Sequence, residues 1–402
     1  MSKRFDTIVL GAGINGCAIA RRLSLQGNKV ALIERNTIGC GTSSNSSKLI
    51  HGGLRYLETG QFGLVRESLR DRKRLYEMYP DLVEMVPFYL PIYDDSPRPW
   101  WVINAGLVLY DLLSWPGKQG DSPSAVYGKG NGLQQGQSPC FPKTEFRHRR
   151  VGNEEFLKRF PGVNEDGLRR VYVYYDGKTD DLELTRRLAG DARECECVVK
   201  ENCEIEEISV EVNRVRVSCS DSEGEQVLEA PLLVNAAGPW IDEVNDRYGL
   251  PHNYRISKVS GIHIVINKKL VPECMFLQTV SRRIFFMIPW KEDATIIGTT
   301  ERMEDGSCDQ VAVREEDINY LLDCANGYLK KPISRPDIAD TFLGIRPLVR
   351  GRDEVDATSM SRDYKIDIVK MAGATLVHVY GGKLTTCLSM AEKVEKAMTY
   401  GV

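Results

Sequence analysis

Apolar and polar positions near the start of the chain alternate in blocks. Residues 5–10 form a short apolar run, residues 14–25 form a helix-like segment, and residues 30–33 form a second apolar run. Short, continuous apolar runs are typical of strands in a parallel sheet, which are buried on both faces. The pattern predicts a strand, a helix that stops at Gly27, and a second parallel strand that ends at Glu34.

Other patterns follow along the chain. Residues 61–79 are charged and helix-like, and residues 114–143 are rich in Gly, Pro, Ser and Gln, which predicts an irregular loop. Alternating runs predict antiparallel strands joined by a turn at 221–224. The predicted antiparallel strands are 205–208, 212–218 and 226–228, followed by a buried strand at 232–238 and by strands at 262–266, 275–277, 284–289 and 295–298.

Glycines occupy the loop between the first strand and the helix. Gly11 permits a tight turn, Gly13 lets the backbone approach a pyrophosphate, and Gly16 allows close helix–strand packing. The free N–H groups of the helix that begins near Ile14 face the phosphates, and the Glu34 carboxylate accepts hydrogen bonds from an adenosine ribose. The motif predicts dinucleotide binding, and an ordinary β-α-β unit without a ligand is the alternative.

The same arrangement recurs near the end of the chain. Residues 376–380 form a short apolar run that leads into Gly381 and Gly382 and then a probable helix start. Both termini are therefore expected to approach one phosphate-bearing cofactor. Residues 41–48 are dense in hydroxyl groups, which hydrogen-bond phosphate and ribityl oxygens and so favour FAD over NAD. A flexible serine-rich linker is the alternative, but the apolar, glycine-paired segment 49–56 follows directly.

Several motifs together resemble a known family, the flavin-dependent glycerol-3-phosphate dehydrogenases, from residue 5 to about residue 395. The resemblance implies the α/β fold of the amino-acid-oxidase-like flavoproteins, with a discontinuous, doubly wound FAD-binding domain of the Rossmann type and a mixed-sheet substrate domain. The motifs are 43–58, 235–240, 288–290, 297–300, 344–348, 361–364 and 381–386. The expected FAD-binding segments are 1–80, 162–258 and 340–402, and the expected substrate segments are 81–161 and 259–339.

The resemblance also implies which residues contact the cofactor. The expected contacts come from both glycine motifs, the hydroxyl-rich run and the small residues after the strand at 232–238. They are Gly11, Gly13, Ile14, Asn15, Gly16, Glu34, Thr42, Ser43, Ser44, Ser47, Leu49, Gly238, Gly382, Lys383, Leu384 and Thr385. Lys383 is expected either to steady negative charge on a reduced flavin or to reach the substrate, with a structural ion pair as the alternative.

Three arginines lie inside family-like motifs and are candidates for binding a substrate phosphate. Arginine suits this task because its planar guanidinium grips two phosphate oxygens at once. Arg55, Arg346 and Arg362 are the candidates, with Tyr56 beside the first, and salt bridges that tie the lobes together are the alternative.

The proton of a substrate hydroxyl needs an acceptor, and two histidines have suitable intrinsic pKa values near ~6.5. His51 lies in the motif at 43–58 and His263 lies on a predicted strand, where a hydrogen-bonded core histidine is the alternative. The expected catalytic set is therefore His51, His263, Arg346 and Lys383. By resemblance the reaction is the oxidation of sn-glycerol 3-phosphate to dihydroxyacetone phosphate, with hydride transfer to FAD. The rival readings are a hydroxy-acid or amine oxidoreductase of the same fold and a non-catalytic FAD-binding protein.

Composition limits the partners. The net charge of −3 gives no reason to expect nucleic acid, and the eleven scattered cysteines predict free thiols in a reducing, cytoplasmic compartment. Cys195, Cys197 and Cys203 lack the nearby histidine of a metal site. Residues 100–110 predict a core helix, or an interfacial helix on the inner face of the cytoplasmic membrane. A quinone is the family's default acceptor, and a carrier protein or oxygen stays open. The family's additional helical C-terminal domain is expected to be absent, since only residues 388–402 follow the last motif.

Overall fold

The protein is represented by a computed structural model that describes residues 2–114, 146–350 and 363–400. Arg362 and nearly all of the predicted loop at 114–143 lie outside these residues. The helices are α1 (Ile14–Leu25), α2 (Phe62–Met78), α3 (Trp100–Ser114), α4 (Asn153–Arg159), α5 (Asp181–Glu194), α6 (Ile241–Tyr248), α7 (Glu315–Asn326) and α8 (Cys387–Tyr400), with 3₁₀ turns η1 (Thr42–Ser44), η2 (Leu54–Leu57), η4 (Gly238–Trp240), η5 (Cys308–Gln310) and η6 (Arg335–Asp337).

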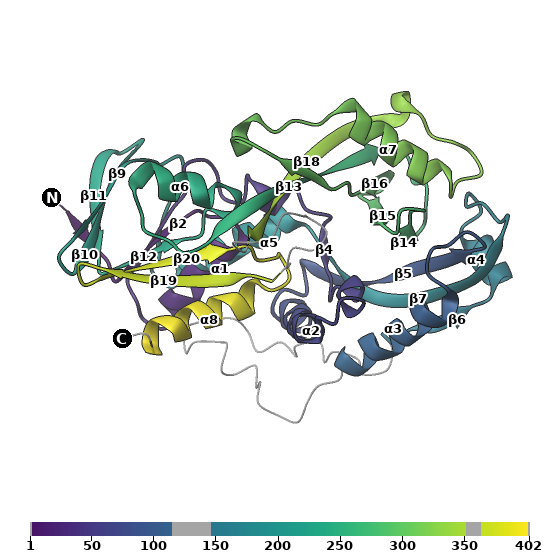
Figure 1. Cartoon of the computed structure of the whole chain (residues 1–402), viewed down its shortest axis with the longest axis horizontal. Coiled ribbons are helices and arrows are strands. Elements are labelled where there is room, and N and C mark those ends of the chain that lie inside the picture. Colours follow the sequence, from purple (N-terminus) through teal and green to yellow (C-terminus); the bar gives the residue numbers. More distant parts are fainter. Residues whose placement is uncertain (1, 115–145, 351–362, 401–402) are drawn as a thin grey trace.

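The first lobe, on the left of Figure 1, is built on a six-stranded sheet that is parallel except at one edge. Its helices α1, α5 and α8 cover one face, and a four-stranded sheet covers the other. The order in the larger sheet is β19 (Lys365–Met371), β20 (Ala374–Tyr380), β12 (Leu232–Asn235), β2 (Thr7–Leu10), β3 (Val30–Ile33) and β8 (Val198–Lys200), and in the smaller one β1 (Lys3–Arg4), β11 (Gly224–Ala230), β10 (Arg214–Asp221) and β9 (Glu204–Glu211).

Strand side chains divide between these two faces, as the period of two requires. Val9 of β2 packs with the helices, whereas its neighbours Ile8 and Leu10 pack against the four-stranded sheet. All three are at most 2% exposed. Burial on both faces explains why the central strands β2, β3 and β12 are mostly apolar.

The second lobe, on the right of Figure 1, is built on a ten-stranded mixed sheet. Helices α4 and α7 cover one face, and α2 and α3 pack on the other. The order is β17 (Arg302–Glu304), β13 (Arg255–Ile266), β16 (Ala294–Gly298), β15 (Ile284–Trp290), β14 (Cys274–Gln278), β5 (Val83–Tyr93), β7 (Leu168–Thr179) and β4 (Leu49–Ile50), with β18 (Ile338–Arg350) paired to β13 and β6 (Arg149–Val151) paired to β7.

The predicted α/β fold with a doubly wound parallel sheet and a mixed sheet is confirmed. The predicted helix at 14–25 is α1, and the predicted antiparallel strands are β9, β10 and β11. The domain boundaries stay a prediction. Strand pairing places β7 and β18, which come largely from the segments assigned to FAD binding, in the ten-stranded sheet.

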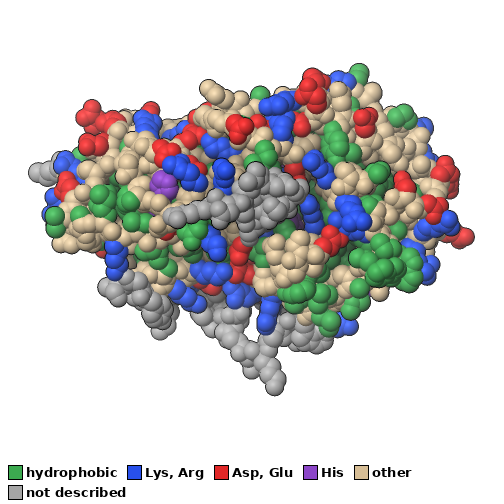
Figure 2. Space-filling view, viewed as in Figure 1, with side chains coloured by type: hydrophobic (Ala, Val, Ile, Leu, Met, Phe, Trp, Pro, Cys, Tyr) green, Lys and Arg blue, Asp and Glu red, His purple; other side chains and the backbone are tan. Residues whose placement is uncertain are grey.

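Helix α3 packs on the ten-stranded sheet, as predicted for a core helix, and contact of residues 100–110 with a membrane stays a prediction. It runs on to Ser114, and it buries Ile103, Leu107 and Tyr110 against the ten-stranded sheet. Its other side exposes Trp101 (61%) and Leu112 (64%), together with parts of Trp100 and Val108. Hydrophobic side chains gather over this helix at the lower right of Figure 2. No helix in residues 2–114, 146–350 and 363–400 is long and apolar enough to span a bilayer.

Candidate functional site

The two glycine motifs follow the carboxyl ends of two parallel strands, β2 and β20, that flank a third strand. β12 lies between β2 and β20, with Asn235 in register with both Leu10 and His378. The loops that follow these strands therefore open at the same edge of the sheet. Asn15, in the first turn of α1, donates a hydrogen bond from Nδ2 to the Gly381 carbonyl at 3.3 Å.

Three of these glycines occupy positions where a side chain would collide. Gly11 has a φ of +94°, and a Cβ there would lie 2.8 Å from the Ala236 carbonyl oxygen. A Cβ on Gly16 would lie 1.9 Å from the Gly11 carbonyl oxygen, and one on Gly382 would lie 2.5 Å from Asn15 Nδ2. Glycine at these positions therefore lets the loops and α1 pack closely at this edge of the sheet.

A cavity of about 850 Å³ runs from this edge to the ten-stranded sheet. Of the predicted site residues that the structure describes, Gly16 and Ser44 do not line it; Gly16 packs inside α1 and Ser44 donates to the Gly41 carbonyl. The lining includes Gly11, Gly13, Ile14, Asn15, Glu34, Thr42, Ser43, Ser47, Leu49, His51, Arg55, Tyr56, Gly238, His263, Arg346, Gly382, Lys383, Leu384 and Thr385.

The amino end of α1 suits an anion. Gly13 is the N-cap and supplies no side chain to the first N–H groups of the helix, so these groups and the helix dipole face the cavity. Ser43 Oγ accepts from Ile14 N at 2.9 Å. Glu34, at the end of β3, accepts from Ala12 N at 2.8 Å and from Asn36 N at 3.0 Å. Its carboxylate is thus fixed at the cavity wall, where a ribose hydroxyl can donate to it.

Three further residues at this end were not identified from the sequence. Arg35 pairs with Asp309 at 2.6 Å, and Trp240 Nε1 donates to the same carboxylate at 2.9 Å. The Arg35 guanidinium carbon lies 4.9 Å from the Trp240 ring centre. Asp309 lies in η5, so the second lobe contacts the cavity beside Glu34. The sequence carried one signal for Trp240, its place in the motif at 235–240.

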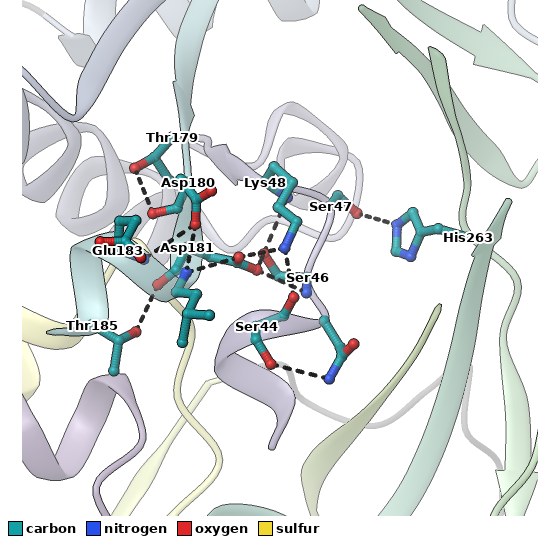
Figure 3. Close-up of polar contacts among 12 residues, drawn as sticks. Ser44, Ser46, Ser47, Lys48, Thr179, Asp180, Asp181, Glu183, Thr185 and His263 are labelled. Atoms are coloured by element: carbon teal, nitrogen blue, oxygen red, sulfur yellow. Dashed lines mark hydrogen bonds and ion pairs between the residues drawn. The ribbon is translucent and has the colours of Figure 1, made fainter. Parts of the chain in front are cut away.

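The hydroxyl-rich run contacts both lobes. Thr42 Oγ1 donates to the Ile345 carbonyl of β18 at 2.7 Å, and Ser47 Oγ lies 2.8 Å from His263 Nε2 on β13 (Figure 3). His263 is buried and stacks on Phe342, with ring centres 4.7 Å apart. Burial, with the positive charges of Arg346 and Lys48, lowers the pKa of His263 to about 3. The imidazole is therefore neutral at pH 7.

Arg55 and Arg346 converge on a carboxylate that sequence reasoning missed. Glu301 Oε1 lies 3.7 Å from Arg55 Nη1 and 4.0 Å from Arg346 Nη1. Arg346 also donates to Thr299 Oγ1 at 3.0 Å. These four residues line the cavity. Glu301 follows the motif at 297–300 directly, which is the only signal that points to it.

The second glycine motif brings Lys383 and His51 to the same wall. Lys383 Nζ lies 3.8 Å from the Tyr56 ring centre. The His51 backbone N–H donates to Thr385 Oγ1 at 3.1 Å. Two of the four residues in the predicted catalytic set, Lys383 and His51, are therefore in or bound to the loop after β20. Positive charge, an imidazole and an aromatic ring thus face one end of the cavity.

In the described parts of the chain, no cluster of His, Cys, Asp or Glu is arranged to hold a metal ion. The ten described cysteines are free thiols. Cys195, Cys197 and Cys203 are among them.

Comparison with known proteins agrees with this geometry. Residues 6–394 match the family model described as FAD dependent oxidoreductase. The aerobic glycerol-3-phosphate dehydrogenase of Escherichia coli (strain K12) is 35% identical over 98% of this chain and 73% of its own length. The D-erythritol 1-phosphate dehydrogenase of Brucella abortus (strain 2308) is 32% identical over 96% of this chain and 72% of its own.

A solved structure supports the fold. The glycerol-3-phosphate dehydrogenase of Bacillus halodurans, in complex with FAD, superposes with a TM-score of 0.73 at 23% identity, over 99% of this chain and 65% of that one. This chain therefore spans about two thirds of the length of that one, and the likeness at this identity concerns the fold alone. Together with the match at 6–394, these relatives confirm the predicted family: the protein belongs to the FAD-dependent oxidoreductases, alongside the flavin-dependent glycerol-3-phosphate dehydrogenases.

Proposed function

We propose that this protein oxidises sn-glycerol 3-phosphate to dihydroxyacetone phosphate with FAD as its cofactor. The observation that carries the proposal is the cavity itself, with a helix amino end and fixed carboxylate at one end and converging arginines at the other. The first end suits a dinucleotide, and the second suits a small phosphorylated alcohol. Relatives named for two polyol phosphates support the substrate class.

The described residues fit FAD. Gly11 and Gly382 allow close approaches of the two loops that a Cβ would block. The N-cap residue Gly13 places no side chain over the first turn of α1, which suits a pyrophosphate. Glu34 accepts from the adenosine ribose. Bound FAD supplies the flavin ring that accepts a hydride from the carbon being oxidised. Thr42, Ser43 and Ser47 contribute hydroxyl groups along the wall between the two ends.

Positively charged side chains bind the phosphate group of the substrate. Arg55 and Arg346 bind the phosphate, with Arg362 as a third predicted cation, while Tyr56 shapes the wall under Lys383. Guanidinium groups suit phosphate because two N–H groups reach two oxygens. Glu301 lies beside both guanidinium groups and competes with the phosphate for them. Lys383 adds positive charge where negative charge develops during the reaction.

His51 is the proposed proton acceptor. An imidazole nitrogen of His51 takes the substrate hydroxyl proton as the carbon loses its hydride, which leaves a carbonyl group. His263 is the alternative, but its Nε2 is engaged with Ser47 and its pKa of about 3 disfavours protonation. His263 then serves as a neutral hydrogen-bonding group in the wall.

The electron acceptor is proposed to be a quinone, reached by contact with the inner face of the cytoplasmic membrane. The exposed side of α3 supports this contact, since Trp101 and Leu112 are apolar and Arg170 lies over the Trp100 ring at 3.7 Å. Aromatic and basic side chains suit a lipid interface. Sedimentation with anionic vesicles should retain the protein, and Trp101→Ser should weaken retention; a protein that stays in the supernatant would exclude this contact.

The first test is anaerobic reduction of the flavin. Glycerol 3-phosphate should bleach the flavin band, whereas unphosphorylated glycerol, a hydroxy acid and glycine should not. D-erythritol 1-phosphate tests for a longer polyol phosphate. A band that persists with every phosphorylated polyol would overturn the substrate assignment.

Arg346→Ala separates substrate binding from cofactor retention. Loss of charge-assisted hydrogen bonds of about 1.5–3 kcal/mol should raise the substrate Kd roughly ten- to hundredfold, while the Kd for FAD changes by less than about threefold. Arg255→Ala, at the exposed start of β13 and paired with Asp246, is the matched control. Equal losses of FAD and substrate in Arg346→Ala would count against the assignment.

A further inference from the structure

A buried ion pair joins the last residue of the hydroxyl-rich run to helix α5. Lys48 Nζ lies 2.5 Å from Asp181 Oδ1, and both side chains are almost inaccessible to solvent. Asp181 is the first residue of α5, so its carboxylate belongs to the helical layer of the first lobe. Neither residue lines the cavity, and the contacts proposed above use neither of them.

The ion pair holds the turn at residues 44–48 at several points (Figure 3). Asp181 Oδ2 accepts from Ser46 N at 3.0 Å and from Ser46 Oγ at 2.6 Å. Lys48 Nζ donates to the Ser44 carbonyl at 2.5 Å. Lys48 has a φ of +60°, in the left-handed region that side chains other than glycine seldom occupy. The turn therefore depends on these contacts to keep its shape.

Ser47 lies between the two anchored residues and reaches the cavity. Its neighbours Ser46 and Lys48 are both bound to the Asp181 carboxylate, so the position of Ser47 follows from that of Asp181. Ser47 Oγ lies 2.8 Å from His263 Nε2, across the boundary between the lobes. A carboxylate on α5 thus controls a contact on β13.

The hydrogen-bond pattern selects one tautomer of His263. Its Nδ1 is buried and has no hydrogen-bond partner among the described residues. A buried N–H without an acceptor is rarer and more costly than a bare acceptor atom, so the ring hydrogen belongs on Nε2. Nε2–H then donates to Ser47 Oγ, and the Ser47 hydroxyl hydrogen is left to donate into the cavity that Ser47 lines.

We propose that Lys48 and Asp181 are a positioning pair, which holds Ser47 against His263 and thereby directs the Ser47 hydroxyl as a hydrogen-bond donor into the cavity. The inference rests on the proposed function, since the group that receives this hydrogen bond is the bound cofactor or substrate. A purely structural ion pair would affect stability and leave the His263 tautomer unchanged. A positioning pair and a purely structural pair therefore predict different effects of substitution on the His263 tautomer.

The first experiment compares Asp181→Asn with Asp180→Asn. Asp180 is the neighbouring carboxylate and the N-cap of α5, and its side chain accepts from Leu182 N and Glu183 N. Asparagine can also cap a helix, so the control makes the same charge change one residue away. Asp181→Asn should slow flavin reduction in anaerobic stopped-flow about tenfold or more, because small misplacements of reacting groups are costly. FAD content and substrate Kd should change by less than about twofold, and Asp180→Asn should match the wild type.

The second experiment observes His263 without substrate. In protein labelled with ¹⁵N-histidine, and with the signal assigned by His263→Gln, the wild type should show the tautomer with its hydrogen on Nε2. The Asp181→Asn and Ser47→Ala proteins should each also show the signal of the tautomer with its hydrogen on Nδ1. A wild-type ring with its hydrogen on Nδ1 would overturn the proposal, as would an Asp181→Asn protein with wild-type tautomer and rate. If glycerol 3-phosphate fails to reduce the wild-type flavin, the proposed function falls, and this measurement still decides the positioning.

A charge-free pair covers the case in which Asp181→Asn does not fold. Replacing a buried ion pair with apolar residues of similar volume is often neutral or stabilising. Lys48→Met combined with Asp181→Leu should therefore fold and retain FAD, yet lose the anchor for Ser46 and show the slow flavin reduction. A wild-type rate in this double variant would overturn the proposal.

Discussion

The two ends of the cavity present different kinds of group to a ligand. At the amino end of α1 the groups that suit a pyrophosphate are backbone N–H groups next to Gly11 and Gly13, with the side chains of Glu34 and Arg35 farther along the wall. At the other end it is long side chains, with Arg55 and Arg346 joined through Glu301. Backbone groups are placed by the sheet itself, whereas each guanidinium depends on its neighbours. Cofactor retention and substrate selection therefore depend on different groups, and a substitution can impair one without the other.

Gly11→Ala should weaken FAD binding at the amino end of α1, and this is the largest of the expected effects. The substitution adds a Cβ 2.8 Å from the Ala236 carbonyl oxygen at a φ of +94°, so the loop must move away from the phosphates. We expect the Kd for FAD to rise roughly a hundredfold or more, by fluorescence titration of the apoprotein, given a backbone cost of about 1–2 kcal/mol before any clash.

Gly27→Ala is the matched control for that experiment. Gly27 follows the same helix with a φ of +83°, and its Cβ would have no neighbour within 4 Å. It should show the backbone cost as lower stability, with the Kd for FAD unchanged within about twofold. Equal loss of FAD in both variants would mean that helix stability, rather than the close approach of the loops at Gly11, controls retention.

The same contrast explains what the sequence could predict. The backbone end follows from local rules, because strand, glycine loop and helix are adjacent in the chain; α1 has the predicted bounds. Fold class and family were also predicted correctly. Pairs such as Arg346 with Glu301, or Lys48 with Asp181, join residues from different elements. Only packing decides which carboxylate meets which cation, so no local pattern identified Glu301, Asp309 or Asp181 as part of the site or its support.

Acid should destabilise both lobes, through one buried histidine in each. Burial lowers the pKa of His263 to about 3 and that of His378, on β20, to about 4. Below the ordinary value near ~6.5 the unfolded chain binds protons that the folded chain does not. Stability should therefore fall as the pH drops from about 6.5 to about 4, with each imidazole contributing up to about 1.4 kcal/mol per pH unit.

Urea unfolding at several pH values measures that slope. His263→Gln and His378→Gln should each make the free energy of unfolding less dependent on pH, because each removes one titrating group. This holds whatever the substitutions do to stability at pH 7. The comparison with the wild type isolates one imidazole from the carboxylates that also titrate in this range. A slope unchanged in both variants would show that neither histidine is held neutral.

Glu301→Gln should strengthen phosphate binding at the charged end of the cavity, and this is the smallest of the expected effects. The carboxylate competes with phosphate for Arg55 and Arg346, at 3.7 and 4.0 Å. Its removal leaves both guanidinium groups with a neutral amide, so the Kd for the substrate and for inorganic phosphate should fall about three- to tenfold, as expected for about 1 kcal/mol from a partly exposed charge. FAD binding at the backbone end should not change.

Glu292→Gln, in the exposed turn between β15 and β16, is the control, because it makes the same charge change away from the cavity. It should leave the affinities for substrate and for phosphate unchanged. Weaker phosphate binding in Glu301→Gln would contradict competition and would mean that the carboxylate's main effect is to orient the two arginines, in which case the charged end is as dependent on fixed geometry as the backbone end.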